Sequence, residues 1–129
     1  MSLLFLYLSF RAKQFACDFL LQNGWMAMNK GLSGKEGLYP LIAHAGIHAA
    51  GTLVIMLIFL PSFWWLALCD FLVHGVVDRL KAVLTKQAEW STKEHRYWIA
   101  FGLDQEAHNL THLFYICVIV TSLGGILSL

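Results

Sequence analysis

Ionisable residues recur at helical spacing inside segments that are otherwise as apolar as membrane-spanning helices. The pattern occurs in four segments, with Gln14, Asp18 and Gln22 in the first, His44 and His48 in the second, Asp70, His74, Asp78 and Lys81 in the third, and Asp104, His108 and His112 in the fourth. Spacings of three or four residues place side chains on one face of an α-helix. An ionisable group at the bilayer centre costs about 2.5–3.5 kcal/mol on insertion scales, so it persists only when it faces other polar groups, an ion or water. The pattern therefore predicts one polar site inside a bundle of membrane helices.

The composition indicates a membrane protein. Of the 129 residues, 58% are hydrophobic and 13% are charged, whereas a soluble domain has about 45–50% and about 25%, respectively. The formal net charge of +1 leaves no basic field of the kind that attracts nucleic acid. The three cysteines are an odd count, and all lie in apolar segments, which argues against a disulfide framework and against a thiolate metal site. We therefore expect membrane lipids, and no nucleic acid, as partners.

The hydropathy pattern predicts a single all-α domain over residues 1–129, folded as a four-helix transmembrane bundle. The four helices are expected at residues 2–24, 40–60, 63–84 and 99–127. Pro40 is expected in the first turn of the second helix, where a missing N–H group costs nothing. The first helix is expected to be retained, because no basic region precedes its apolar run as in a signal peptide. Within it, Arg11 is placed on the polar stripe, and Lys13 is expected to point away from the stripe toward the lipid headgroups.

Basic residues give the expected bundle an orientation. They gather in the connections at residues 25–37 and 85–98, while the connection at Pro61–Ser62 carries no charge. The positive-inside rule places basic connections in the cytoplasm. Both termini are then expected outside, and all four polar segments lie near the cytoplasmic leaflet.

Four short blocks, in this order, carry a resemblance to a known family: DFLLQNGWMAMNKG, HAGIHAAGT, HGVVDRLK and DQEAHNL. Together they resemble the family called domain of unknown function 3307, which comprises small membrane proteins of bacteria and their phages without an established activity. The resemblance implies a multi-pass protein of the bacterial inner membrane. The residues that match the family's polar set are Asp18, Gln22, Lys30, His44, His48, His74, Asp78, Lys81, Asp104, Gln105 and His108. Gln14 departs from the family pattern, which often has a histidine there; if that histidine is a metal ligand in relatives, this chain has lost one ligand or uses water in its place.

Histidine and aspartate without thiolate form a ligand set that suits Zn²⁺, Mn²⁺ or non-haem iron. His44 and His48 can chelate an ion from one helix face, but Ala45 stands where a zinc metalloprotease of the His-Glu-x-x-His type has its catalytic glutamate. The predicted metal ligands are His44, His48, His74, Asp78, Asp104 and His108. This set suffices for one open site or for two metals that share a carboxylate. We expect a divalent metal, with Zn or Mn favoured.

Three functions fit this site. The first is a metal-dependent membrane hydrolase of a lipid or lipid-linked phosphate, in which Asp18 and Gln22 position water and Lys81 holds the phosphate. The second is a non-enzymatic phage or bacterial protein that binds another membrane protein or a second copy of itself, with the polar network joining its helices. The third is a proton or ion relay. The apolar outer halves of the second and fourth helices argue against a relay that crosses the membrane in a monomer.

Overall fold

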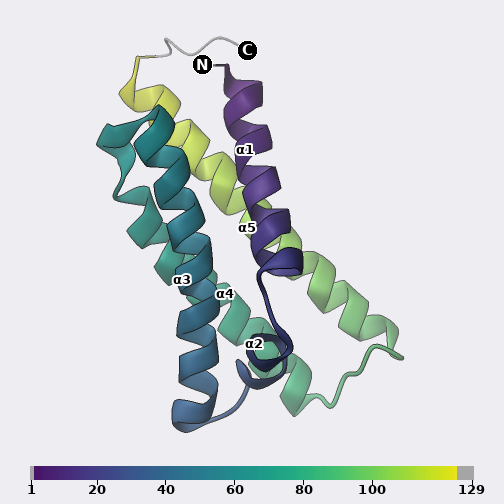
Figure 1. The fold of residues 1–129 in the computed structure, drawn as a ribbon. Coiled ribbons are helices and arrows are strands. Elements are labelled where there is room, and N and C mark those ends of the chain that lie inside the picture. The colour runs from purple at the N-terminus through teal and green to yellow at the C-terminus, as the bar shows by residue number, and fades with distance from the viewer. Residues whose placement is uncertain (1, 125–129) are drawn as a thin grey trace.

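A computed structural model describes residues 2–124 and contains helices but no strand in that range. The helices are α1 (Leu3–Phe15), a π-helical turn (Ala16–Leu20), α2 (Gly24–Asn29), α3 (Gly34–Phe59), a 3₁₀ turn (Pro61–Phe63), α4 (Leu66–Gln87) and α5 (His95–Ser122). This confirms the prediction of an all-α chain. The four long helices form an elongated bundle, and α2 closes one end of it (Figure 1).

The two ends of the bundle differ in charge. Helix α1 starts and α5 finishes at the same end, while α2 and the connection between α4 and α5 lie at the other (Figure 1). That second end carries the basic residues of both predicted connections. There, the backbone N–H and the hydroxyl of Ser91 both donate to the exposed Glu94 carboxylate, and these bonds lower the pKa of Glu94. We refer to the two ends as the terminal end and the basic end.

Helix α3 begins earlier than its proline suggests. Its first residue is Gly34, so Pro40 lies inside the helix and not in its first turn. Gly34 has a φ of +64°, a left-handed conformation that glycine adopts without strain. A Cβ atom at Gly37 would lie 1.8 Å from the carbonyl oxygen of Leu32. The expected start at residue 40 was therefore wrong. Because Gly37 has no side chain, the backbone of Leu32 can pack against the helix there, and the helix extends back to Gly34.

The interior is apolar toward the terminal end and polar toward the basic end. The apolar part consists of Leu6, Phe10, Ile55, Met56, Phe63, Leu66, Tyr115, Ile116 and Ile119. The buried polar residues are Lys13, Gln14, Lys30, His44, His48, Thr52, Asp70, His74, Asp78, Thr85, Asp104, His108 and His112. This number of buried ionisable groups is far above that of an ordinary soluble core. The fold thus encloses its polar side chains instead of displaying them.

The exterior of the long helices is rich in large apolar side chains. Exposed examples are Leu4, Phe5, Leu8 and Phe15 on α1, Val54, Leu57 and Ile58 on α3, Leu72, Val76 and Leu80 on α4, and Leu103, Leu110 and Phe114 on α5. Among the helices that the structure describes, α3 alone is long and apolar enough to cross a membrane by length and composition. The other long helices fall short because α1 has only 13 residues and because α4 and α5 carry many of the charged and imidazole groups of the interior. Four spans in the inner membrane therefore stay a proposal.

Helix α1 presents a different face to the interior than expected. Leu6 and Phe10 are completely buried, and Lys13 continues their face with only 7% of its surface exposed. The expectation that Lys13 points toward the headgroups was wrong. Arg11, in contrast, lies at the side of the bundle, where its Nη1 donates to Oδ1 of Asn109 on α5 at 3.4 Å. Apolar and polar residues share the inner face of α1, so the polar residues alone could not define it.

Candidate metal centre

Seven imidazole and carboxylate side chains meet inside the bundle, in the half toward the basic end. They are Asp18 from the π-helical turn, His44 and His48 from α3, His74 and Asp78 from α4, and Asp104 and His108 from α5. We call these residues the His/Asp cluster. None of its four imidazoles is more than 2% exposed. Helical periodicity accounts for most of the convergence, because α3, α4 and α5 each contribute a pair of residues four positions apart on the inner face.

Asp18 enters the cluster from an irregular turn. Residues 16–20 form a π-helix, a distortion that often marks functional sites. Two amides hold one oxygen of the Asp18 carboxylate, because Nε2 of Gln14 and Nε2 of Gln105 each donate to Oδ2 at 2.8 Å. Gln14 is therefore a hydrogen-bond donor to the cluster. The other carboxylate oxygen, Oδ1, remains directed at imidazoles.

Two groups of side chains in the cluster have the mutual spacing of metal ligands. The first is Asp18, His44, His48 and His74, and the second is His74, Asp78 and His108. Within each group, one donor atom per residue lies within 4.8 Å of all the others. His74 belongs to both groups, so the two arrangements are adjacent and share one imidazole.

Several of the short distances in the cluster are not hydrogen bonds. Nε2 of His44 lies 3.3 Å from Oδ1 of Asp18 and 3.1 Å from Oδ2 of Asp78. It nevertheless has no partner in hydrogen-bond geometry. By contrast, Nε2 of His48 meets Oδ1 of Asp18 at 3.0 Å, and Nε2 of His108 meets Oδ1 of Asp78 at 3.2 Å, in hydrogen-bond geometry. Close but misaligned donors and acceptors of this kind are compatible with ligands around a common ion.

Buried ring nitrogens without a partner are frequent in the cluster. Among the described residues, both nitrogens of His44 and of His74, and Nδ1 of His48, are buried without a hydrogen bond. A buried polar atom left unpaired costs about 1–3 kcal/mol. Native proteins rarely leave several such atoms together. These nitrogens call for a bound ion or for water, and they belong to the first ligand group.

Three imidazoles form a stacked column. The ring centroids of His48 and His74 are 3.5 Å apart, and those of His74 and His108 are 3.7 Å apart, with interplanar angles of 27° and 12°. Positive charges on neighbouring rings of this column would repel each other strongly. Neutral imidazole is the form that binds metal ions. The stacking is thus compatible with a metal centre and unfavourable for a column of protonated histidines.

A buried lysine reaches the cluster from the connection between α2 and α3. Lys30 is only 5% exposed, and its Nζ lies 2.6 Å from Oδ2 of Asp78. Nη1 of Arg79 donates to the carbonyl oxygens of Lys30 and Leu32, at 2.8 Å and 2.6 Å, and holds this connection against α4. Resemblance to the family marked Lys30, but helical spacing did not, because Lys30 lies outside the long helices.

The remaining predicted site residues lie at the edge of the cluster. Gln22 follows the end of the π-helical turn, and its side chain makes no hydrogen bond to any described residue. Lys81 is half-buried, with Nζ 5.2 Å from the ring centroid of Phe101. Asp104 is buried, and its Oδ1 lies 3.5 Å from Nε2 of His108 without a hydrogen bond. Asp104, a member of the cluster, lines the same surface pocket as Lys81, whereas nothing in the geometry ties Gln22 to the site.

A second polar cluster lies one helical turn deeper. Nζ of Lys13 lies 2.6 Å from Oδ2 of Asp70 and 3.2 Å from Nε2 of His112. The hydroxyl of Thr52 donates to the same Asp70 oxygen at 2.7 Å. Gly51 makes room for the lysine, because a Cβ there would lie 2.9 Å from Cγ of Lys13. The sequence pointed to Asp70 and His112 as a deeper extension of the site, and the structure adds the cation that neutralises Asp70.

The family described as Protein of unknown function (DUF3307) matches residues 4–128. This match confirms the resemblance carried by the four sequence blocks. It spans every member of the His/Asp cluster and of the deeper polar cluster. No curated protein and no solved structure matches the chain.

Proposed function

The chain belongs to this family of unknown function, and we propose that it is an integral membrane metalloprotein that hydrolyses a lipid or lipid-linked phosphate. The observation that carries the proposal is the convergence of buried imidazoles and carboxylates in the His/Asp cluster. Several ring nitrogens of these imidazoles lack a hydrogen-bond partner. An ordinary structural network would pair these atoms with one another. A divalent cation is the ligand that satisfies several of them at once.

Membrane insertion is supported by the inverted distribution of side chains. Many large apolar residues on all four long helices are exposed, while every aspartate and every histidine of those helices except His95 is buried. Monomeric soluble proteins rarely expose contiguous apolar surface beyond a few hundred Å². Helix α3 meets the length and hydropathy expected of a span. With the basic end in the cytoplasm, as the positive-inside rule indicates, the His/Asp cluster lies nearer the cytoplasmic leaflet.

The donor set favours Zn²⁺ or Mn²⁺. The ligands are imidazole nitrogens and carboxylate oxygens, and Cys17 does not compete because its Sγ faces the carbonyl oxygen of Ile47 at 3.8 Å. The first group offers four ligands, and the second offers three. Catalytic zinc sites commonly use three protein ligands and keep one position open. His74, Asp78 and His108 are therefore the better candidates for a centre that also binds water and substrate.

A divalent ion bound there would activate water for attack on phosphorus and would stabilise the negative charge that develops on the phosphate oxygens. In this reaction a new P–O bond forms from water while the ester P–O bond breaks. We assign the proton of the attacking water to Oδ1 of Asp104, which has no other partner and which then passes the proton to the alkoxide that leaves as the lipid alcohol. Lys81 holds the phosphate. Asp18 orients His44 and His48, or joins them as a ligand, since its carboxylate lies within the first group.

The alternative of a proton or ion relay is disfavoured by the interior of the terminal end. In the described part of the bundle, the polar interior stops at Lys13 and His112. Beyond them, Leu6, Phe10 and Ile119 are completely buried and apolar. A continuous polar path across the bundle is therefore interrupted.

The non-enzymatic alternative is a protein that binds another membrane protein. The experiment below distinguishes it from the enzyme.

Metal analysis of purified protein tests the proposal. We expect a stoichiometric divalent ion in detergent-purified protein, and less of it in His74→Gln. The matched control is His95→Gln, because His95 is exposed at the start of α5 and lies outside the cluster. The loaded protein should release phosphate from lipid phosphates in mixed micelles. Folded protein that stays metal-free after incubation with Zn²⁺ and Mn²⁺ would contradict the metal centre and favour the binding protein.

A further inference from the structure

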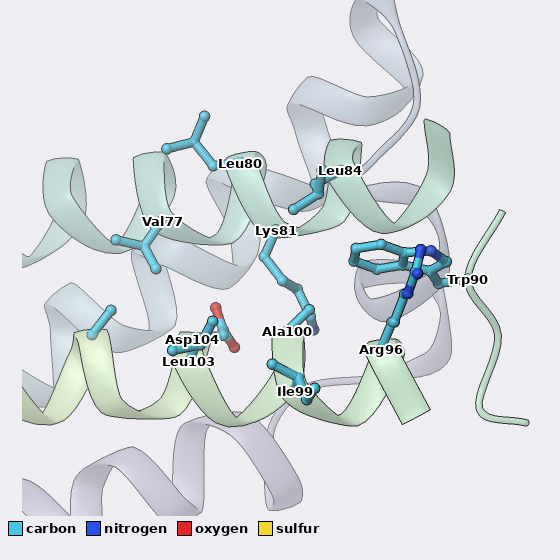
Figure 2. A pocket seen from close by; sticks show the side chains of 11 residues that line it. Val77, Leu80, Lys81, Leu84, Trp90, Arg96, Ile99, Ala100, Leu103 and Asp104 are labelled. Carbon is cyan, nitrogen blue, oxygen red and sulfur yellow. The ribbon is translucent and has the colours of Figure 1, made fainter. Parts of the chain in front are cut away.

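A groove between α4 and α5 runs along the outside of the His/Asp cluster. Its volume is about 630 Å³, within the range of about 300–1,000 Å³ that is typical of ligand sites. Most of its wall is apolar, with Val77 and Leu80 on α4 and Ile99 and Leu103 on α5 (Figure 2). An elongated apolar groove open to the surroundings suits a hydrocarbon chain.

Two cations line the groove toward its basic end. Lys81 projects from α4, and Arg96 projects from the first turn of α5 beside Trp90 (Figure 2). Among the described residues, neither of these side chains forms an ion pair or a hydrogen bond. Arginine binds phosphate through paired N–H groups, and lysine binds it as a point charge. The groove therefore offers a phosphate two cations that have no anionic partner among the described residues.

The groove reaches the cluster through Asp104. This residue lines the groove (Figure 2) and is only 6% exposed. Its Oδ1 has no hydrogen bond and lies 3.5 Å from Nε2 of His108. Asp104 is thus the contact between the apolar groove and the second ligand group. A molecule in the groove would place its polar end near residues that we assign to the metal centre.

We propose that this groove binds the hydrocarbon chain of an anionic phospholipid such as phosphatidic acid. The inference rests on the proposed function and names the substrate class of that site. The chain lies along Val77, Leu80 and Leu103, toward the middle of the bundle. The phosphate lies between Lys81 and Arg96, next to Asp104. This polarity matches a lipid in the cytoplasmic leaflet, with its headgroup at the basic end.

The opposite side of α4 provides an internal comparison. A second apolar groove, of about 300 Å³, lies between α3 and α4 and is lined in part by Ile42, Phe71 and Leu72. Its cation, Arg79, already donates to the carbonyl oxygens of Lys30 and Leu32. That groove therefore has apolar walls but no free cation. If charge selects the lipid, only the groove between α4 and α5 discriminates between headgroups.

Photo-crosslinking in nanodiscs tests the proposal without depending on catalysis. The probe is phosphatidic acid with a diazirine in one acyl chain, and the adducts are mapped by mass spectrometry. We expect adducts on Leu80 and Leu103 that excess phosphatidic acid displaces and excess phosphatidylcholine does not. The double variant Lys81→Gln/Arg96→Gln should lower them by about fivefold or more. The double variant Lys35→Gln/Lys93→Gln, which loses the same charge from two exposed positions, should leave them unchanged.

Two outcomes would overturn the assignment: equal labelling of both grooves, and equal competition by phosphatidylcholine. A second variant, Leu103→Trp, fills the groove from a position outside the ligand set. It should abolish the adducts while the metal content of the protein stays at the wild-type level. If protein that contains no metal is still labelled selectively in this groove, the lipid site is supported and only the metal centre is contradicted.

Discussion

Nζ of Lys30 lies 2.6 Å from Oδ2 of Asp78, the oxygen that also lies 3.1 Å from Nε2 of His44. A lysine ammonium and an imidazole therefore approach the same carboxylate oxygen. The ammonium neutralises a carboxylate that is only 2% exposed. A metal ion bound to Asp78 would partly take over this role. Lys30 thus links the folding of the basic end to the occupancy of the candidate metal centre.

Replacement of Lys30 by methionine should destabilise metal-free protein strongly and metal-loaded protein less. Breaking one side of a buried ion pair costs about 3–5 kcal/mol, whereas an ion on Asp78 would replace the lost cation. The measurement is the thermal unfolding temperature in detergent, with and without Zn²⁺. The control is Lys35→Met, because Lys35 is exposed near the same connection. Equal loss of stability in both states would show that no metal replaces the lysine.

Replacement of His74 by glutamine should lower metal content more than replacement of either stacked neighbour. His74 belongs to both ligand groups, whereas His48 and His108 each belong to one. Elemental analysis of His74→Gln, His48→Gln and His108→Gln provides the ranking. Bound metal should also fall as the pH is lowered, because protons compete for imidazole and carboxylate ligands. Equal metal content in all three variants and the wild type would remove the cluster as the binding site.

Replacement of two glycines of α3 by alanine should have opposite effects on the stability of the protein. Gly37→Ala should destabilise the protein, because its Cβ would lie 1.8 Å from the backbone oxygen of Leu32. The loop that carries Lys30 must then move, and metal content should fall with it. Gly46→Ala is the matched control, since nothing lies within 4 Å of its Cβ. Helix propensity predicts that Gly46→Ala stabilises by about 1 kcal/mol. A Gly37→Ala protein as stable as the wild type would contradict the close contact.

Loss of Lys13 should be costly alone and tolerated together with a change at Asp70. Lys13→Met leaves the buried Asp70 carboxylate without its cation, for an expected cost of about 3–5 kcal/mol. Lys13→Met/Asp70→Asn removes both charges and keeps a side-chain oxygen that accepts from Thr52. Thermal unfolding of the two variants measures the difference. If the double variant is no more stable than Lys13→Met, the ion pair at 2.6 Å is not the source of the cost.

The orientation of the bundle can be checked by cysteine labelling in intact cells. Ser33, Ser62 and Ser91 are all exposed and lie in three different connections. In a background without the native cysteines, Ser62→Cys should react with an impermeant reagent, and the other two should react only after lysis. This expectation follows from the basic residues around Ser33 and Ser91. The reverse labelling pattern would place the His/Asp cluster near the outer leaflet.

The pairing of residues within each long helix was predictable from the sequence. His44 and His48, or Asp104 and His108, share a face because helical periodicity is a local property of the backbone. The all-α class and the family were predictable for related reasons, since hydropathy and short ordered blocks are read along the chain. The position of Gln22 escaped this reading. Gln22 lies outside the cluster because the chain leaves its helical path after Leu20.

The partners of the buried charges were decided by the tertiary structure. Lys13 meets Asp70 across 57 positions of the chain, and Lys30 meets Asp78 across 48. Neither ion pair can be predicted from local residue spacing, because each depends on how the helices are rotated and on where the loops pack. The inner face of α1 is shared by Phe10 and Lys13, so polarity alone could not identify it. In this chain, helical periodicity determines which side chains share a face, and packing between helices determines which opposite charges meet.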